Sequence, residues 1–136
     1  MANAHEIELP SRIESVEEAA SRAEKFARSC GLGDDIVSAV DLAIRESVAN
    51  AVKHGNKFDE SKKVVISFAD TVDRFAISVR DFGSGFAVEE IPDPTNPENL
   101  LKANGRGILF MNSFMDEVEW LTPEGGGLEV RMIKKK

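Results

Sequence analysis

The chain has 136 residues, 42% of them hydrophobic, and a formal net charge of −7. This length and composition suit one globular domain over residues 1–136, which can bury roughly 68% of its unfolded surface. The negative charge disfavours direct contact with nucleic acid, which requires clustered lysines and arginines. No apolar run approaches the roughly 18 residues of a membrane span. The single cysteine excludes an internal disulfide, so the composition predicts a cytoplasmic protein that does not contact a membrane.

The first half of the chain alternates between strand and helix patterns. Residues 5–9, HEIEL, are followed by Pro10, which predicts a short edge strand. Ser15 and Glu18 have the spacing of a capping box for a helix that ends at Gly31.

A second helix follows this glycine. Asp34 or Asp35 is the expected cap at its start, and Gly55 is the expected left-handed residue at its end. This helix contains the first group of candidate functional residues.

The second half is dominated by strand patterns. KVVISFA at 63–69 and RFAISVRD at 74–81 predict a hairpin, and EVEWL at 117–121 and GLEVRMI at 127–133 predict two further strands. Residues 86–104 contain three prolines and little periodicity, which is typical of a functional or disordered loop. An apolar helix is expected at 108–115. The predicted fold is therefore α+β, with two layers: a mostly antiparallel mixed sheet and helices on one face.

The helix that ends with AIRESVANAVKHGN, residues 43–56, has an unusual polar face. At about 100° per residue, Glu46, Asn50 and Lys53 lie within about 40° of one another. The opposite side carries Val37, Ile44 and Val48 and is expected to face the core. The neighbours of Glu46 and Asn50 on the polar side are alanines (Ala39, Ala43 and Ala49), whereas a solvated stripe usually carries long charged chains. The helix therefore has three faces: one for the core, one for solvent, and one with short side chains.

The flank of the same helix that faces solvent is more ordinary. Asp41 and Arg45 lie there with the spacing of an i,i+4 ion pair.

Two glycine clusters add chemistry to that face. In RDFGSGF, Asp81 ends a strand and is followed by Gly83 and Gly85; in NGRGI, Gly105 and Gly107 directly precede a helix. Each cluster alone is common in ordinary turns. Together with the helix face they provide a carboxylate acceptor, room for close approach, phosphate-binding amides, and an Asn/Glu pair suited to Mg²⁺ chemistry.

The three motifs, ESVANAVKHG at 46–55, DFGSG at 81–85 and GRG at 105–107, resemble the N, G1 and G2 boxes of the GHKL ATPases, which share the Bergerat fold. The sequence FMNSFMDEVEW at 110–120 is also similar to one branch of these ATPases, the anti-sigma-factor serine/threonine kinases, which consist of this domain alone. The similarity extends over nearly the whole chain.

The resemblance implies ATP and Mg²⁺ as ligands and assigns roles to the first two motifs. Glu46 would be the general base that takes a proton from the attacking hydroxyl, and Asn50 would bind Mg²⁺. Asp81 would accept a hydrogen bond from the adenine amino group, and Gly83 and Gly85 would let the backbone approach the nucleotide.

The same resemblance assigns the phosphate-binding parts. Gly105 and Gly107 would shape the turn at the helix start and bring amides to the phosphates. Lys53 and Arg106 are further candidates for phosphate contact, although Arg106 suits a position facing solvent equally well. Residues 86–104 would form a lid over the triphosphate.

The biological role implied by the resemblance is bacterial partner switching. The protein would phosphorylate a serine or threonine of a small anti-sigma-factor antagonist and would hold a sigma factor or similar regulator; a homodimer is implied by analogy. An alternative is a catalytically silent nucleotide-binding module that sequesters a regulatory partner. Glu46 favours the kinase, because a module that only binds has no need of a general base.

Two related classes fit less well. HEIELP at 5–10 superficially matches a phosphoacceptor box of histidine kinases, but that box requires a long helix, whereas Pro10 and the alternating pattern predict a strand. Gyrase-like and mismatch-repair ATPases need a transducer domain, which a chain of this length is not expected to contain.

Overall fold

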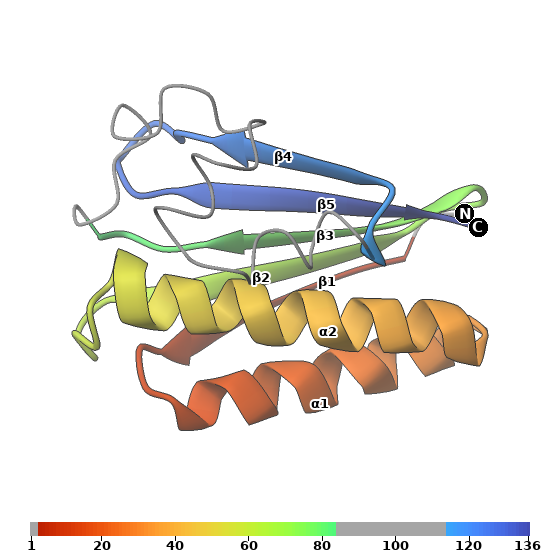
Figure 1. The fold of residues 1–136 in the computed structure, drawn as a ribbon, viewed down its shortest axis with the longest axis horizontal. Helices are drawn as coiled ribbons and strands as arrows, with labels where there is room; N and C mark the ends of the chain where they lie inside the picture. Colours follow the sequence, from red (N-terminus) through yellow and green to blue (C-terminus); the bar gives the residue numbers. More distant parts are fainter. Residues whose placement is uncertain (1–2, 84–113) are drawn as a thin grey trace.

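The computed structural model describes residues 3–83 and 114–136 of the chain. These residues form two layers, a five-stranded sheet and two helices that cover one of its faces (Figure 1). The strand order is β1-β2-β3-β5-β4, and each pair of neighbours in this order is antiparallel. The predicted α+β fold is therefore confirmed.

The five strands alternate between a buried and a more exposed face. They are β1 (Asn3–Pro10), β2 (Lys63–Asp70), β3 (Arg74–Arg80), β4 (Glu117–Leu121) and β5 (Glu129–Lys135). One row of register partners crosses all five strands on the face that carries the core: Ile7, Ile66, Val79, Val130 and Trp120. Because side chains alternate with period two, this row fixes which face of every strand meets the helices.

The two helices bury complementary surfaces. Helix α1 (Glu14–Ser29) contributes four alanines that are completely buried, namely Ala19, Ala20, Ala23 and Ala27. Helix α2 (Asp34–Asn50) buries Val37, Ile44 and Val48, which confirms its predicted apolar side. Within the described residues, no helix is both long and apolar enough to span a membrane.

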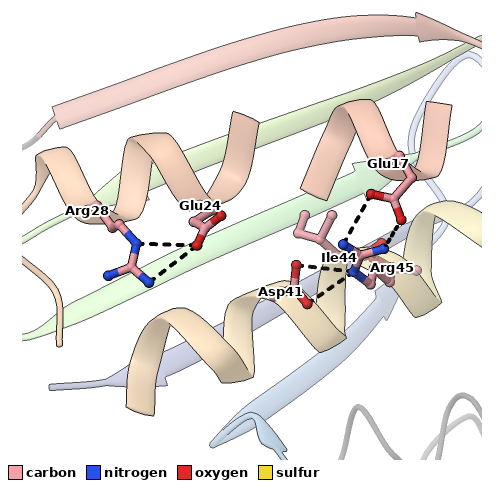
Figure 2. Close-up of polar contacts among 7 residues, drawn as sticks. Glu17, Glu24, Arg28, Asp41, Ile44 and Arg45 are labelled. Atoms are coloured by element: carbon pink, nitrogen blue, oxygen red, sulfur yellow. Dashed lines mark hydrogen bonds and ion pairs between the residues drawn. The ribbon is translucent and has the colours of Figure 1, made fainter. Parts of the chain in front are cut away.

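An ion-pair network joins the outer surfaces of the helices (Figure 2). Arg45 Nε donates to Asp41 Oδ2 at 3.0 Å, which confirms the predicted pair within α2. The same guanidinium also reaches Glu17 of α1, and both carboxylates raise the pKa of Arg45. The network therefore joins α1 and α2 on the surface away from the sheet, and because its side chains are exposed or partly exposed, it adds little to stability.

The helix starts differ from the predicted caps. Helix α1 begins at Glu14, so Ser15 lies inside its first turn, and the Ser15 hydroxyl donates to Pro10 O at 2.6 Å instead of capping the helix. Helix α2 begins at Asp34 after an extended Gly33, so both aspartates lie in the first turn, where their charge favours the helix dipole. Helix α1 ends at Ser29, two residues before its predicted end at Gly31, and Gly31 has φ of 79°.

The end of α2 continues into a single π-helical turn, η1 (Ala51–Gly55). Asn56 N donates to Ala51 O at 2.8 Å, the i→i+5 hydrogen bond that defines this wider turn. The left-handed residues that then reverse the chain are Lys57 and Phe58, with φ of 52° and 61°. The prediction that Gly55 is the left-handed residue was therefore wrong.

Candidate functional site

The site lies where the end of α2 meets the end of β3. A small cavity of about 20 Å³ separates the two elements. Its wall is formed by residues of α2 and η1 and by residues of the sheet, namely Ser47, Asn50, Ala51, His54 and Gly55, and Val79, Asp81, Trp120, Leu128 and Val130. The fold thus brings together Asn50 and Asp81, which the sequence placed in separate motifs.

Asp81 is the first residue after β3 and is only 5% exposed. Its backbone N–H donates to Leu128 O at 3.0 Å, which holds this residue against the segment that leads into β5. Its carboxylate Oδ1 accepts a hydrogen bond from Gly83 N at 3.0 Å. The carboxylate is therefore fixed by its own chain while its side chain lines the cavity.

Two glycines allow this close packing. A Cβ added to Gly55 would lie 2.1 Å from Asp81 Oδ2, and one added to Gly83 would lie 1.6 Å from Gly55 O. Both distances are far below van der Waals contact, so neither position has room for a side chain. Gly55 is required because it packs against Asp81, not because of a left-handed conformation.

We expect Gly83→Ala to lower the free energy of unfolding by at least about 2 kcal/mol, because two backbone segments would have to separate. Chemical denaturation of the purified variant measures this change. Gly33→Ala is a matched control, since a Cβ there meets no atom within 4 Å; its effect should stay within about 1 kcal/mol. Equal effects of the two variants would contradict the prediction.

Burial raises the pKa of Asp81 from 3.8 to about 6. Backbone hydrogen bonds with Gly83 and Leu128, and the positive charges of Arg80 and Lys62, act in the opposite direction. Desolvation of the carboxylate prevails because the residue is almost completely buried.

This raised pKa predicts a pH dependence. Because the folded-state pKa lies above the unfolded value, the proton on Asp81 stabilises the fold at low pH, and this contribution is lost as the pH rises through about 6. Asp81→Asn keeps an oxygen for Gly83 but cannot ionise. Relative to wild type, its free energy of unfolding should therefore increase between about pH 4 and pH 7, by up to about 3 kcal/mol. Urea titrations of both proteins across this pH range test the prediction. A difference in free energy of unfolding that stays constant with pH would contradict it.

The helix side of the site is formed by Asn50, which lines the cavity. Asn50 Nδ2 is buried, and no described residue provides it with a hydrogen-bond partner. This unsatisfied atom is a donor, so it calls for an acceptor and does not itself bind a cation. The oxygen of the same carboxamide is a ligand type that Mg²⁺ accepts, and it is this atom that would fill the role implied by the motif.

The two other candidates on the helix face lie differently. Glu46, one turn before Asn50, is half-buried and does not line the cavity. Lys53 is exposed and also lies outside the lining, whereas His54 and Gly55 are part of it. Ala39 and Ala43 of the same face are buried, and Ala49 is half-buried. Only the part of this face next to Asn50 borders the cavity.

The remaining candidates lie outside the described residues. These are Gly85, Gly105, Arg106 and Gly107, together with the expected lid at 86–104 and most of the helix expected at 108–115. Within residues 3–83 and 114–136, no group of three or more His, Cys, Asp or Glu side chains is placed to hold a metal ion.

Sequence reasoning missed two parts of the site. The first is Asn56, whose buried side chain connects η1 to the residue after Asp81. The second is the loop between β4 and β5, where Gly125, Gly126 and Gly127 all have positive φ and a Cβ on Gly127 would lie 1.9 Å from Asp81 O. The three consecutive glycines could have indicated this loop from the sequence. No sequence pattern indicates the role of Asn56, because its hydrogen-bond partners are distant in the sequence.

The two-layer α+β fold of the described residues is that of a known class of domain. The family model described as the histidine kinase-like ATPase domain matches residues 9–134, and the chain belongs to this family. This confirms the resemblance predicted from the three motifs.

Individual proteins of this family are also similar to the chain. The anti-sigma F factor of Clostridium perfringens (strain SM101) is 36% identical over 100 residues, which cover 71% of this chain and 70% of that protein. The serine-protein kinase RsbW of Listeria monocytogenes (strain EGD-e) is 23% identical over 134 residues, which cover 92% of this chain and 85% of that protein.

Solved structures share the fold. A crystal structure of the RsbU and RsbW domains of a Mycobacterium tuberculosis protein superposes with a TM-score of 0.70 at 16% identity, covering 97% of this chain and 31% of that one. The catalytic domain of histidine kinase ThkA gives a TM-score of 0.57 at 16% identity, covering 97% of both chains.

Proposed function

We propose that this chain is an ATP- and Mg²⁺-dependent protein serine/threonine kinase and an anti-sigma factor, which phosphorylates a small anti-sigma-factor antagonist. The observation that carries this proposal is the buried Asp81 carboxylate, held by glycine contacts in the wall of a cavity that Asn50 also lines. The names of the relatives, an anti-sigma F factor and serine-protein kinases, support both activities.

In this proposal the base and the phosphates of the nucleotide contact different motifs. Asp81 accepts a hydrogen bond from the adenine amino group, and Gly83 and Gly85 give the backbone room beside the base. Lys53, Gly105, Arg106 and Gly107 contribute to phosphate binding. Asn50 holds Mg²⁺ through its side-chain oxygen, and the ion offsets the charge of the phosphates.

The transfer step uses Glu46 as general base. Its carboxylate takes the proton from the serine or threonine hydroxyl of the antagonist, whose oxygen then bonds to the γ-phosphorus of ATP while the bond to the β-phosphate oxygen of ADP breaks. Glu46 lies one helical turn from Asn50, so both residues belong to the γ-phosphate end of the site.

The proposed partners are the antagonist and a sigma factor or similar regulator, with a second copy of the chain as a further partner. Since these partners regulate transcription, the proposed place of action is the cytoplasm. The net charge of −7 supports regulation through protein contacts and not through direct contact with nucleic acid. We further propose that residues 1–136 act as one domain with a lid at 86–104.

Two measurements test the function. Mg²⁺-ATP or Mg²⁺-ADP should raise the melting temperature, since a ligand at 100 times its Kd adds about 2.7 kcal/mol of stability. With radiolabelled ATP, label should pass to the antagonist that co-purifies with the protein. Absence of a shift with ATP, ADP and GTP would contradict nucleotide binding. A shift without transfer would favour the silent module that only sequesters a partner.

A further inference from the structure

The side chain of Asn56 is buried in a complete hydrogen-bond network. Only 2% of the residue is exposed. Its Nδ2 donates to Ser11 Oγ at 2.7 Å and to Lys63 O at 3.1 Å, and its Oδ1 accepts from Phe82 N at 2.9 Å. Both amide hydrogens and the carbonyl oxygen therefore have partners, which fixes the orientation of the carboxamide.

This network connects three separate parts of the fold. Ser11 lies between β1 and α1, Lys63 is the first residue of β2, and Phe82 directly follows Asp81. Ser11 is itself completely buried, and its hydroxyl donates to Lys62 O at 2.5 Å. Asn56 thus has a donor side, which binds the β1–β2 edge of the sheet, and an acceptor side, which binds the chain that carries Asp81.

The acceptor side completes the support of Asp81. The β3 ladder ends at Arg80, so the next two amides need acceptors elsewhere. Asp81 N–H donates to Leu128 O on one side, and Phe82 N–H donates to Asn56 Oδ1 on the other. The backbone of Asp81 is therefore held from both sides, while Gly55, the residue before Asn56, packs against its carboxylate.

We infer that Asn56 is a positioning residue for base recognition. Its Oδ1 accepts a hydrogen bond from the Phe82 amide and thereby keeps the Asp81 carboxylate in the position from which it can accept a hydrogen bond from the adenine amino group. This inference rests on the proposed function, because it assumes that Asp81 meets adenine. Asn56 itself does not line the cavity. Its effect is on the choice of base, through the placement of the acceptor.

The test compares Asn56→Ala with Ser11→Ala. Both variants remove the hydrogen bond between Asn56 and Ser11, but only the first removes the acceptor of the Phe82 amide. Isothermal titration with Mg²⁺-ATP and Mg²⁺-GTP, well below the melting temperature of each protein, gives the ratio of the two affinities. A smaller folded fraction lowers both affinities equally, so this ratio is insensitive to stability alone.

We expect Asn56→Ala to lower the preference for ATP over GTP by about tenfold. This is the effect expected when the hydrogen bond from the adenine amino group to the charged Asp81 carboxylate is lost. Ser11→Ala should keep the wild-type ratio even if it melts at a lower temperature. An unchanged ratio in Asn56→Ala, with a normal ratio in wild type, would overturn the inference alone. A wild-type protein that does not prefer ATP would overturn the proposed function as well.

A second measurement covers the case in which Asn56→Ala does not fold. Hydrogen exchange of wild-type protein reports directly on the Phe82 amide. Its exchange should be slowed at least about 100-fold relative to an unprotected amide, as expected for a donor bonded to a buried acceptor. Exchange of this amide at the unprotected rate would overturn the inference.

Discussion

Glu46→Ala should slow phosphoryl transfer to the antagonist by about 10²-fold or more, while the affinity for Mg²⁺-ATP stays within about three-fold of wild type. The reason is that a general base acts on the attacking hydroxyl and not on the bound nucleotide. Asn50→Ala should lose transfer and nucleotide affinity together, because its side chain is proposed to hold Mg²⁺. Single-turnover transfer of radiolabel and titration with Mg²⁺-ATP separate the two effects.

The matched control for Glu46 is Asp35→Ala, which removes an exposed carboxylate from the first turn of the same helix. Its transfer rate should equal that of wild type, and its stability should fall by no more than about 1 kcal/mol, the effect of one charge on the helix dipole. If Glu46→Ala behaves like this control, Glu46 is an ordinary helix residue and the assignment of the base is wrong.

Asp81→Asn should remove most of the preference for adenine nucleotides. The variant replaces a charged acceptor with a neutral amide, and a site built to bind one hydrogen-bonding pattern discriminates strongly against another. We expect the affinity for Mg²⁺-ATP to fall by at least about 30-fold, equivalent to about 2 kcal/mol. The gain in stability expected for this variant near neutral pH makes the loss of binding easy to distinguish from unfolding.

Asp70→Asn is the appropriate comparison, because Asp70 is also a buried aspartate at a strand end. It lies at the opposite end of β2 and β3 and pairs with Lys136 at 2.6 Å. This variant should bind Mg²⁺-ATP as wild type does. Similar losses of ATP affinity in both variants would show that the effect of Asp81→Asn is a general one of buried charge and not recognition of the base.

Much of the fold followed from hydrophobic patterning. Period-two alternation predicted each described strand, and the valine and isoleucine positions of α2 predicted the side that faces the core. The last strand was predicted at 127–133 but runs over Glu129–Lys135. It starts later because Gly125–Gly127 adopt positive φ, and it ends later because Lys134 and Lys135 pair with Phe75 and Arg74.

The candidate site was predictable as a set of motifs but not as a geometry. Asp81 and Asn50 do line one cavity, yet the support of Asp81 depends on contacts between segments that are distant in sequence. The helix arithmetic assumed about 100° per residue throughout, and it fails after Asn50, where the π-helical turn begins. A wide turn of this kind is set by the tertiary contacts of Gly55 and Asn56, which no local pattern reports.

That wide turn decides which changes in chain length the segment can accept. η1 holds one residue more than an α-helical turn would. A single-codon deletion between 51 and 54 would let i→i+4 bonding continue and would leave Gly55 and Asn56 close to their places beside β3. An added codon would rotate these two residues away from Asp81 and Phe82, because the turn already holds its extra residue. In a library of single-codon changes, insertions in this segment should therefore be lost more often than deletions, whereas insertions in the exposed stretch at 59–61 should be retained.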